Sequence, residues 1–106
     1  MKWIPVLLIL SLTAAVQAEP VEEYYQEVAK TVSLPYELEG LGPILDPSGR
    51  EHYRFSRDER GQVLRVTHYN EKGEITDNAE GWADFHAFYD ANGVVLSVGY
   101  YDTSGR

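Results

Sequence analysis

Residues 90–93 read Asp-Ala-Asn-Gly, and the pattern they belong to, Asp/Asn-x-x-Gly, recurs through the C-terminal part of the chain. Its five occurrences lie at 46–49, 58–61, 70–73, 90–93 and 102–105, with glycines 12, 12, 20 and 12 residues apart. A leading Asp or Asn accepts a hydrogen bond from the backbone two residues on, and the closing Gly adopts a positive φ without steric cost. Short loops of this kind join antiparallel strands, so the pattern predicts repeated β-hairpins.

The segments between these turns are rich in Val, Tyr, Phe and Leu and are predicted to be strands. The predicted strands are residues 51–57, 62–69, 74–76, 82–89 and 94–101. Residues 77–81, Asp-Asn-Ala-Glu-Gly, account for the longer glycine interval and are predicted as a polar interruption. We therefore expect residues 51–106 to form a five-strand antiparallel β-meander.

The segment before the meander has a different apolar spacing. Residues 19–32 place apolar side chains at the i, i+3, i+4 and i+7 spacing of an amphipathic helix, namely Val21, Tyr24, Tyr25, Val28 and Val32. Residues 33–50 are rich in Pro and Gly and are predicted as a connector, anchored by Leu41, Ile44 and Leu45. The predicted fold class is α+β, with one N-terminal helix packed on the meander and residues 19–106 forming one domain.

The turns also predict a strand register. A three-residue loop at 59–61 places Asp58 opposite Gln62 and His52 opposite His68, and the same geometry at 90–93 places Phe88 opposite Leu96. Side chains alternate between the faces of a sheet, so the register predicts two faces. The predicted core face, covered by the helix, carries Leu64, Val66, Trp82, Phe88, Leu96, Val98 and Tyr100. The opposite face carries Tyr53, Phe55, Arg65, Thr67, Tyr69, Phe85, Tyr89 and Tyr101.

Residues 1–18 have the organisation of a secretory signal peptide. Met1-Lys2 supplies a positive start, residues 4–12 are almost wholly apolar, and Val16-Gln17-Ala18 is a small-residue processing site. Cleavage after Ala18 predicts a periplasmic or secreted protein with no stable membrane anchor after processing. The chain has no cysteine, so it contains no disulfide, which favours a bacterial periplasm over an animal extracellular space.

The composition is acidic, with a net charge of −8. Removal of residues 1–18 leaves eight basic residues against seventeen acidic ones. Nucleic acids and anionic membranes are not expected partners, because binding to them depends on Lys and Arg. No cofactor is expected.

Two stretches resemble a known repeat family. Phe88-Tyr89-Asp90-Ala-Asn-Gly93, and Gly99-Tyr-Tyr101-Asp102-Thr-Ser-Gly105-Arg106, resemble the YD repeats of Rhs-type proteins and are similar to degenerate bacterial repeats of the MORN type. The resemblance implies hairpin-forming units and no particular activity.

Metal binding and catalysis receive little support. His52, His68 and His86 are weak candidates for a metal site that depends on the predicted register, and no compact ligand motif accompanies them. Asp90 and Asn92 offer oxygens, but the apolar residues that follow supply none of the further ligands that calcium needs. Asp84 and His86 could form an acid–base pair, but no nucleophile accompanies them, so an enzyme is not expected.

The aromatic residues remain the strongest candidates for a binding site. We predict a partner-binding surface of Tyr53, Phe55, Tyr69, Trp82, Phe85, Tyr89 and Tyr101, because aromatic side chains are enriched in contact surfaces. Burial of this face, or self-association through it, stays open as an alternative. The expected function is an exported non-enzymatic module that recognises another protein, such as an inhibitor or immunity-type partner. The alternatives are a glycan- or envelope-binding protein that uses Trp82 and the tyrosines and, ranked last, a small hydrolase.

Overall fold

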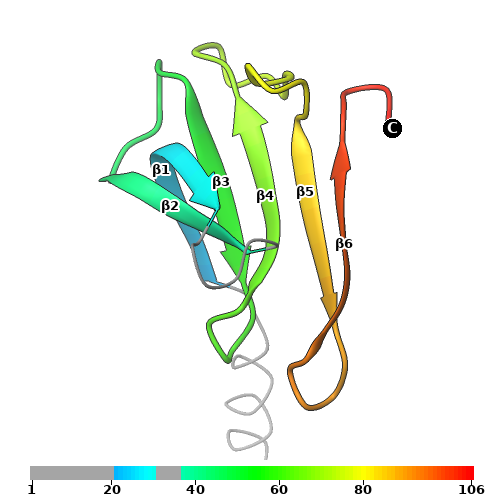
Figure 1. Ribbon diagram of the computed structural model, residues 1–106. Helices are drawn as coiled ribbons and strands as arrows, with labels where there is room; N and C mark the ends of the chain where they lie inside the picture. The colour runs from blue at the N-terminus through cyan, green and yellow to red at the C-terminus, as the bar shows by residue number, and fades with distance from the viewer. Residues whose placement is uncertain (1–20, 31–36) are drawn as a thin grey trace, which may run out of the picture.

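The computed structural model describes residues 21–30 and 37–106, which form one antiparallel sheet of six strands (Figure 1). The strands are β1 (Val21–Lys30), β2 (Leu38–Ile44), β3 (His52–Arg57), β4 (Val63–Tyr69), β5 (Asp84–Tyr89) and β6 (Val95–Tyr101). Their order in the sheet is β2-β1-β3-β4-β5-β6, so β1 lies between β2 and β3 and each later strand pairs with the next. Among the described residues, no helix is long and apolar enough to cross a membrane.

The prediction of a helix over residues 19–32 is wrong, because residues 21–30 form β1. The neighbouring tyrosines show why: Tyr25 contacts the ring of Phe55 at 5.0 Å on one face of the sheet, and Tyr24 contacts His52 at 5.8 Å on the other. Apolar residues at helical spacing also fit a strand that is partly covered on both faces, and Val and Tyr favour strands. The α+β assignment is therefore replaced by a six-strand β-sheet.

The other N-terminal expectations also change. The predicted connector, 33–50, contains strand β2. Of its expected anchors, Ile44 is buried, whereas Leu41 and Leu45 are exposed. Within the predicted strand at 74–76, only Ile75 pairs, through an isolated bridge to Tyr69. Val32 and the predicted signal peptide, 1–18, lie outside the described residues.

Four of the five predicted turns form as the pattern predicts. In the first, at 46–49, Asp46 Oδ1 accepts from the Ser48 amide at 3.0 Å, but the closing backbone bond runs from the Arg50 amide to the Pro47 carbonyl at 3.4 Å. In the turn after β3, the Gly61 amide donates to the Asp58 carbonyl at 3.0 Å, and Asp58 Oδ1 accepts from the amides of Arg60 and Gln62, both at 2.9 Å. Gly61 has φ 84°, a conformation that favours glycine. The same three bonds recur at Asn70, Asp90 and Asp102.

A sixth turn of the same type replaces the predicted polar interruption at 77–81. Asn78 Oδ1 accepts from the amides of Glu80 at 3.0 Å and Trp82 at 3.1 Å, and the Gly81 amide donates to the Asn78 carbonyl at 3.0 Å. With Gly81 included, the turn glycines are 12, 12, 8, 12 and 12 residues apart.

This spacing reveals an internal duplication. The turns that begin at residues 46, 58 and 70 recur 32 residues later at 78, 90 and 102. Hairpins β3–β4 and β5–β6 are therefore counterparts, which we call unit 1 (residues 46–77) and unit 2 (residues 78–106). The second strands of the two units have identical residues at four pairs of positions, namely Val63/Val95, Leu64/Leu96, Val66/Val98 and Tyr69/Tyr101.

Each unit carries a β-bulge at the same place. Pairing shifts by one residue between Ser56 and Arg57 in unit 1, and between Phe88 and Tyr89 in unit 2. The residues left without an opposite partner are Leu64 and Leu96, which stand between Val63 and Arg65 and between Val95 and Ser97. The predicted register is therefore wrong beyond each bulge: His52 lies opposite Tyr69 instead of His68, and Phe88 lies opposite Ser97 instead of Leu96.

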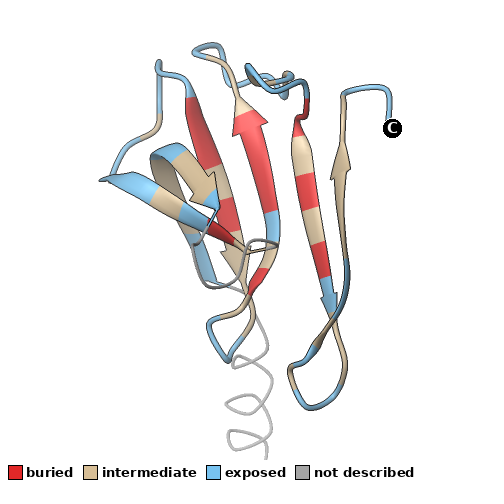
Figure 2. Ribbon diagram, viewed as in Figure 1, coloured by how far each residue is buried: buried red, intermediate tan, exposed pale blue. Residues whose placement is uncertain are grey.

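A slip of one residue exchanges the faces of a strand, and the predicted core face is wrong in part for this reason. Of its seven residues, Val66 and Trp82 are in the buried core, and Val98 and Tyr100 pack against it as predicted. Phe88 and Leu96, both expected in the core, are 52% and 67% exposed. The face that we call the inner face carries the buried core, which is concentrated on β3, β4 and β5 (Figure 2). Its buried residues are Leu38, Tyr53, Phe55, Val63, Val66, Trp82, Phe85 and Ala87.

The sheet curls around this inner face. The Lys30 ammonium in β1 lies 5.7 Å from the centre of the Tyr100 ring in β6. In a flat sheet these two strands, four positions apart, would be separated by roughly 19 Å. Curling brings the β1–β2 hairpin over the inner face, as Figure 1 shows, and this hairpin takes the place of the predicted covering helix.

Candidate functional site

The seven predicted partner-binding aromatics do not form one surface. Phe55 and Phe85 are 0% and 1% exposed, and Tyr53 and Trp82 are also buried in the core. Tyr89 lies on the inner face and donates its hydroxyl to the Val63 carbonyl at 2.7 Å. Only Tyr69 and Tyr101 lie on the opposite face, which we call the outer face. The alternative of burial therefore holds for four of the seven residues.

The predicted histidine site does not assemble. His52 lies on the outer face, stacked on Tyr69 at 5.1 Å, whereas His68 lies on the inner face. His68 Nε2 is 2.6 Å from Glu51 Oε2, and its Nδ1 is 2.7 Å from the Thr76 carbonyl. No group of three His, Cys, Asp or Glu residues that could hold a metal occurs in the described part of the chain. The unit 1 bulge is the physical cause, because it moves His52 and His68 to opposite faces.

The oxygen-rich turn at 90–93 is likewise explained by its backbone. Asp90 Oδ1 accepts from the amides of Asn92 and Val94, both at 2.9 Å. This carboxylate oxygen is thus engaged in forming the turn.

The Asp84 carboxylate, on the outer face, accepts three side-chain hydrogen bonds. Arg65 donates to it through Nε at 2.9 Å and Nη2 at 2.7 Å, and Thr67 donates through its hydroxyl at 2.9 Å. Burial alone would raise the pKa of Asp84, but the hydrogen bonds from Arg65 and Thr67 outweigh it and hold this pKa below its usual value. His86 Nε2 is farther away, at 3.6 Å from Oδ1. Asp84 therefore joins β4 to β5 as an ionised acceptor, an environment that suits neither a general acid nor a base with a pKa near neutrality.

Asp84→Asn is expected to lower the free energy of unfolding at pH 7 by about 1 kcal/mol, because it removes a charge-assisted contact. A lowered folded-state pKa stabilises the fold above the unfolded-state value near 3.8 and loses this effect as the pH falls through the folded-state value. The difference between wild type and Asp84→Asn should therefore disappear in strong acid. Urea titrations from pH 7 to pH 2 measure it, with Glu59→Gln in an exposed turn as the control. A difference that stays constant down to pH 2 would contradict this assignment.

The outer face has two related hollows. The first, about 420 Å³, includes His52, Arg54 and Tyr69 in unit 1, and the second, about 500 Å³, includes their counterparts Asp84, His86 and Tyr101 in unit 2. In unit 1 the Arg54 guanidinium stands over the Tyr69 ring at 5.3 Å. In unit 2 His86 takes the place of Arg54 and contacts the Tyr101 ring at 5.3 Å.

The two edges of the sheet differ strongly. Strand β2, Leu-Glu-Gly-Leu-Gly-Pro-Ile, contains Pro43, two glycines and the charged Glu39, all of which oppose pairing with another strand. Strand β6, Val-Leu-Ser-Val-Gly-Tyr-Tyr, contains neither a charge nor a proline. Among the described residues, no strand pairs with the edge of β6 that faces away from β5.

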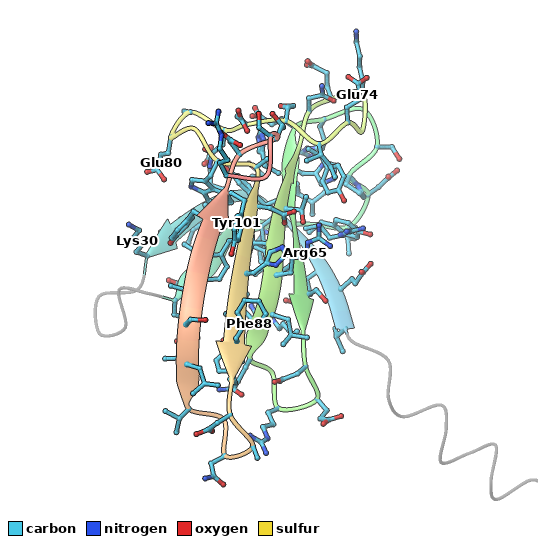
Figure 3. The ribbon with its side chains drawn as sticks, turned by 90° about the vertical axis from the view of Figure 1, so that its right-hand side faces the viewer. Lys30, Arg65, Glu74, Glu80, Phe88 and Tyr101 are labelled. Atoms are coloured by element: carbon cyan, nitrogen blue, oxygen red, sulfur yellow. The ribbon has the colours of Figure 1, made fainter. Side chains whose placement is uncertain are left out.

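Exposed apolar side chains lie next to this edge. Leu96 and Val94 are 67% and 58% exposed, and Phe88 is 52% exposed on the outer face of β5 (Figure 3). Figure 3 also places Lys30 away from Phe88 and Arg65, on the opposite side of the sheet. The candidate site is therefore the β6 edge with Phe88, Leu96, Val98 and Tyr101. The register inferred from the turns wrongly assigned Phe88 and Leu96 to the core, whereas Val98 does pack against the core as predicted. The charge-free stretch 94–101 could have identified the edge.

Comparisons with protein-family models, with curated proteins and with solved structures find no significant match to this chain. The resemblance to YD and MORN-type repeats stays a prediction.

Proposed function

We propose that this protein is an exported, non-enzymatic interaction module that binds an extended segment of a partner protein through strand β6. The observation that carries the proposal is the contrast between the two edges of one sheet. An exposed strand edge pairs readily with another chain, and natural proteins usually block such edges with charge or proline. β2 is blocked in this way and β6 is not.

The surroundings of β6 support the same function. Strand addition derives its affinity from main-chain hydrogen bonds and its specificity from side-chain contacts on either face. Leu96 and Phe88 offer apolar contacts beside the edge. A glycan site built on Trp82 has less support, because Trp82 is buried and its indole N–H donates to Glu80 at 3.2 Å.

Export is part of the proposal and has a simple test. Cleavage after Ala18 gives a mature chain that begins at Glu19, and the intact mass of the protein recovered from the periplasm or medium measures this. Recovery of the unprocessed chain from the cytoplasm alone would contradict export.

Site-specific photo-crosslinking tests the binding surface. A photoreactive residue at Leu96, beside the β6 edge, is expected to form adducts with a partner protein in the exporting cell. The matched control is the same residue at Leu41 in β2, which is also an exposed edge leucine (43% exposed). Equal adduct formation at both edges, or none at Leu96, would overturn the proposed use of β6.

A further inference from the structure

Comparison of the two units shows which neighbouring strand is missing beside β6. Strand β4 is the counterpart of β6, and the side of β4 that corresponds to the free side of β6 is occupied by β5. The pairs between β4 and β5 are Thr67↔Asp84, Val66↔Phe85 and Arg65↔His86. The His68 amide donates to the Ala83 carbonyl at 2.8 Å in the same ladder. The counterparts of His68 and Val66 are Tyr100 and Val98, whose backbone groups therefore face the free side of β6.

Resting on the proposed function, we infer that β6 accepts an antiparallel segment of a basic partner protein, with an apolar residue opposite Val98 and a Lys or Arg opposite Gly99. The expected register between β6 and the partner segment is the same as that between β4 and β5. The partner's strand would thus extend the sheet as β5 extends unit 1.

The apolar position follows from the inner face. Phe85, opposite Val66, is buried and contacts the Tyr100 ring at 5.0 Å. Val98 is the counterpart of Val66 and is only partly buried, because β6 lies at the edge of the described sheet. An apolar side chain opposite Val98 would cover it, and burial of such surface stabilises association.

The basic position follows from the outer face. Arg65 and Thr67 in unit 1 together bind the Asp84 carboxylate of the neighbouring strand β5. These two side chains therefore favour an acidic residue at that position of the neighbouring strand. Their counterparts in β6 are Ser97 and Gly99, so β6 offers no positive charge at these positions. The preference for an acidic residue is therefore lost in unit 2.

Two features then favour a cation opposite Gly99. The aromatic ring of Tyr101 lies nearby and, unlike Tyr69 in unit 1, has His86 beside it in place of an arginine. Aromatic rings attract Lys and Arg. Besides Asp84, which is paired with Arg65, unit 2 carries Glu80, Asp90 and Asp102 against Arg106 alone. The whole chain has a net charge of −8, which further favours a basic segment.

Synthetic peptides based on β5 test the inference against the mature protein. The parent peptide is Trp82–Tyr89, and a second peptide carries Asp84→Arg, the position that would lie opposite Gly99. A third adds Phe85→Ser to the second. We expect the Asp84→Arg peptide to bind roughly tenfold more tightly than the parent, as a cation–π contact and charge attraction together allow, and the third peptide to lose this binding. Titration calorimetry gives the affinities, and slowed amide exchange at Val98 and Tyr100 identifies the edge.

The outcomes separate the two proposals. Tighter binding of the parent peptide would overturn the basic preference and leave the proposed function standing. Absence of amide protection at Val98 and Tyr100 at millimolar peptide would overturn the inferred register and chemistry. The proposed function is tested separately, by crosslinking from Leu96. A solution mass of a dimer that Val98→Pro converts to a monomer would also overturn the inference, because a second copy would then occupy β6.

Discussion

Phe85→Ala is expected to destabilise the protein by about 3–5 kcal/mol, whereas Phe88→Ala should change its stability by less than about 0.5 kcal/mol. The two residues lie three positions apart in β5 and face opposite sides of the sheet. Phe85 is 1% exposed and packs in the core, and Phe88 is 52% exposed. A loss of this size approaches the total stability of a small domain, so much of the Phe85→Ala protein should be unfolded.

Urea denaturation followed by circular dichroism measures both changes, and each variant serves as the control for the other. The register predicted from the turns alone would give the reverse result, because it placed Phe88 in the core. A large loss for Phe88→Ala with a small loss for Phe85→Ala would therefore contradict the bulge in unit 2 and the assignment of the inner face.

Val98→Pro is expected to weaken partner binding at β6 by at least about tenfold, because it removes a ladder hydrogen bond and places a ring at the pairing edge. Val98→Ala is the matched variant, since both substitutions remove the valine side chain but only proline removes the backbone N–H. Proline is tolerated in an edge strand when its nitrogen faces away from the neighbouring strand. We therefore expect both proteins to fold and only Val98→Ala to retain most of the binding.

The measurement combines crosslinking yield from Leu96 with thermal unfolding of each variant. Equal binding by Val98→Pro and Val98→Ala, with both proteins folded, would contradict pairing through the β6 backbone. If Val98→Pro does not fold, Ser97→Lys places a charge beside the same edge and is expected to reduce binding in its place.

The hairpins could be predicted from the sequence because each turn is specified locally. The Asp or Asn oxygen, the backbone amides that it accepts and the positive φ of the glycine all lie within five residues. The turn at 78–81 carries the same signal and could also have been predicted. It was missed because the pattern begins at Asn78, next to the more prominent Asp77.

The faces of the sheet could not be predicted from the turns. A bulge of one residue at Leu64 or Leu96 leaves the turn unchanged and reverses every side chain beyond it. No residue in Gln62–Arg65 differs in kind from those of an unbulged strand. The signal lay in the alternation of Tyr53, Phe55, Phe85 and Ala87, which could have identified the buried face independently of any turn.

Strand β1 could not be distinguished from a helix by apolar spacing alone, because its side chains are partly covered on both faces. Its β-branched and aromatic residues were the better guide. The candidate site was predicted only in part: Tyr101, next to the β6 edge, was among the aromatic residues predicted to bind a partner, but Tyr53, Phe55, Trp82 and Phe85 are buried in the core.

The 32-residue offset between the two units also bears on how such a sheet changes during evolution. Both units contain the same kind of turn after each of their two strands, and both present the second strand in the same orientation. Gain or loss of one whole unit would therefore move the proposed binding edge sideways by two strands while preserving which side chains face inward and which face outward. Partner preference would then change through a few substitutions on the last strand, as the difference between Arg65 and Ser97 illustrates, with the scaffold beneath left intact.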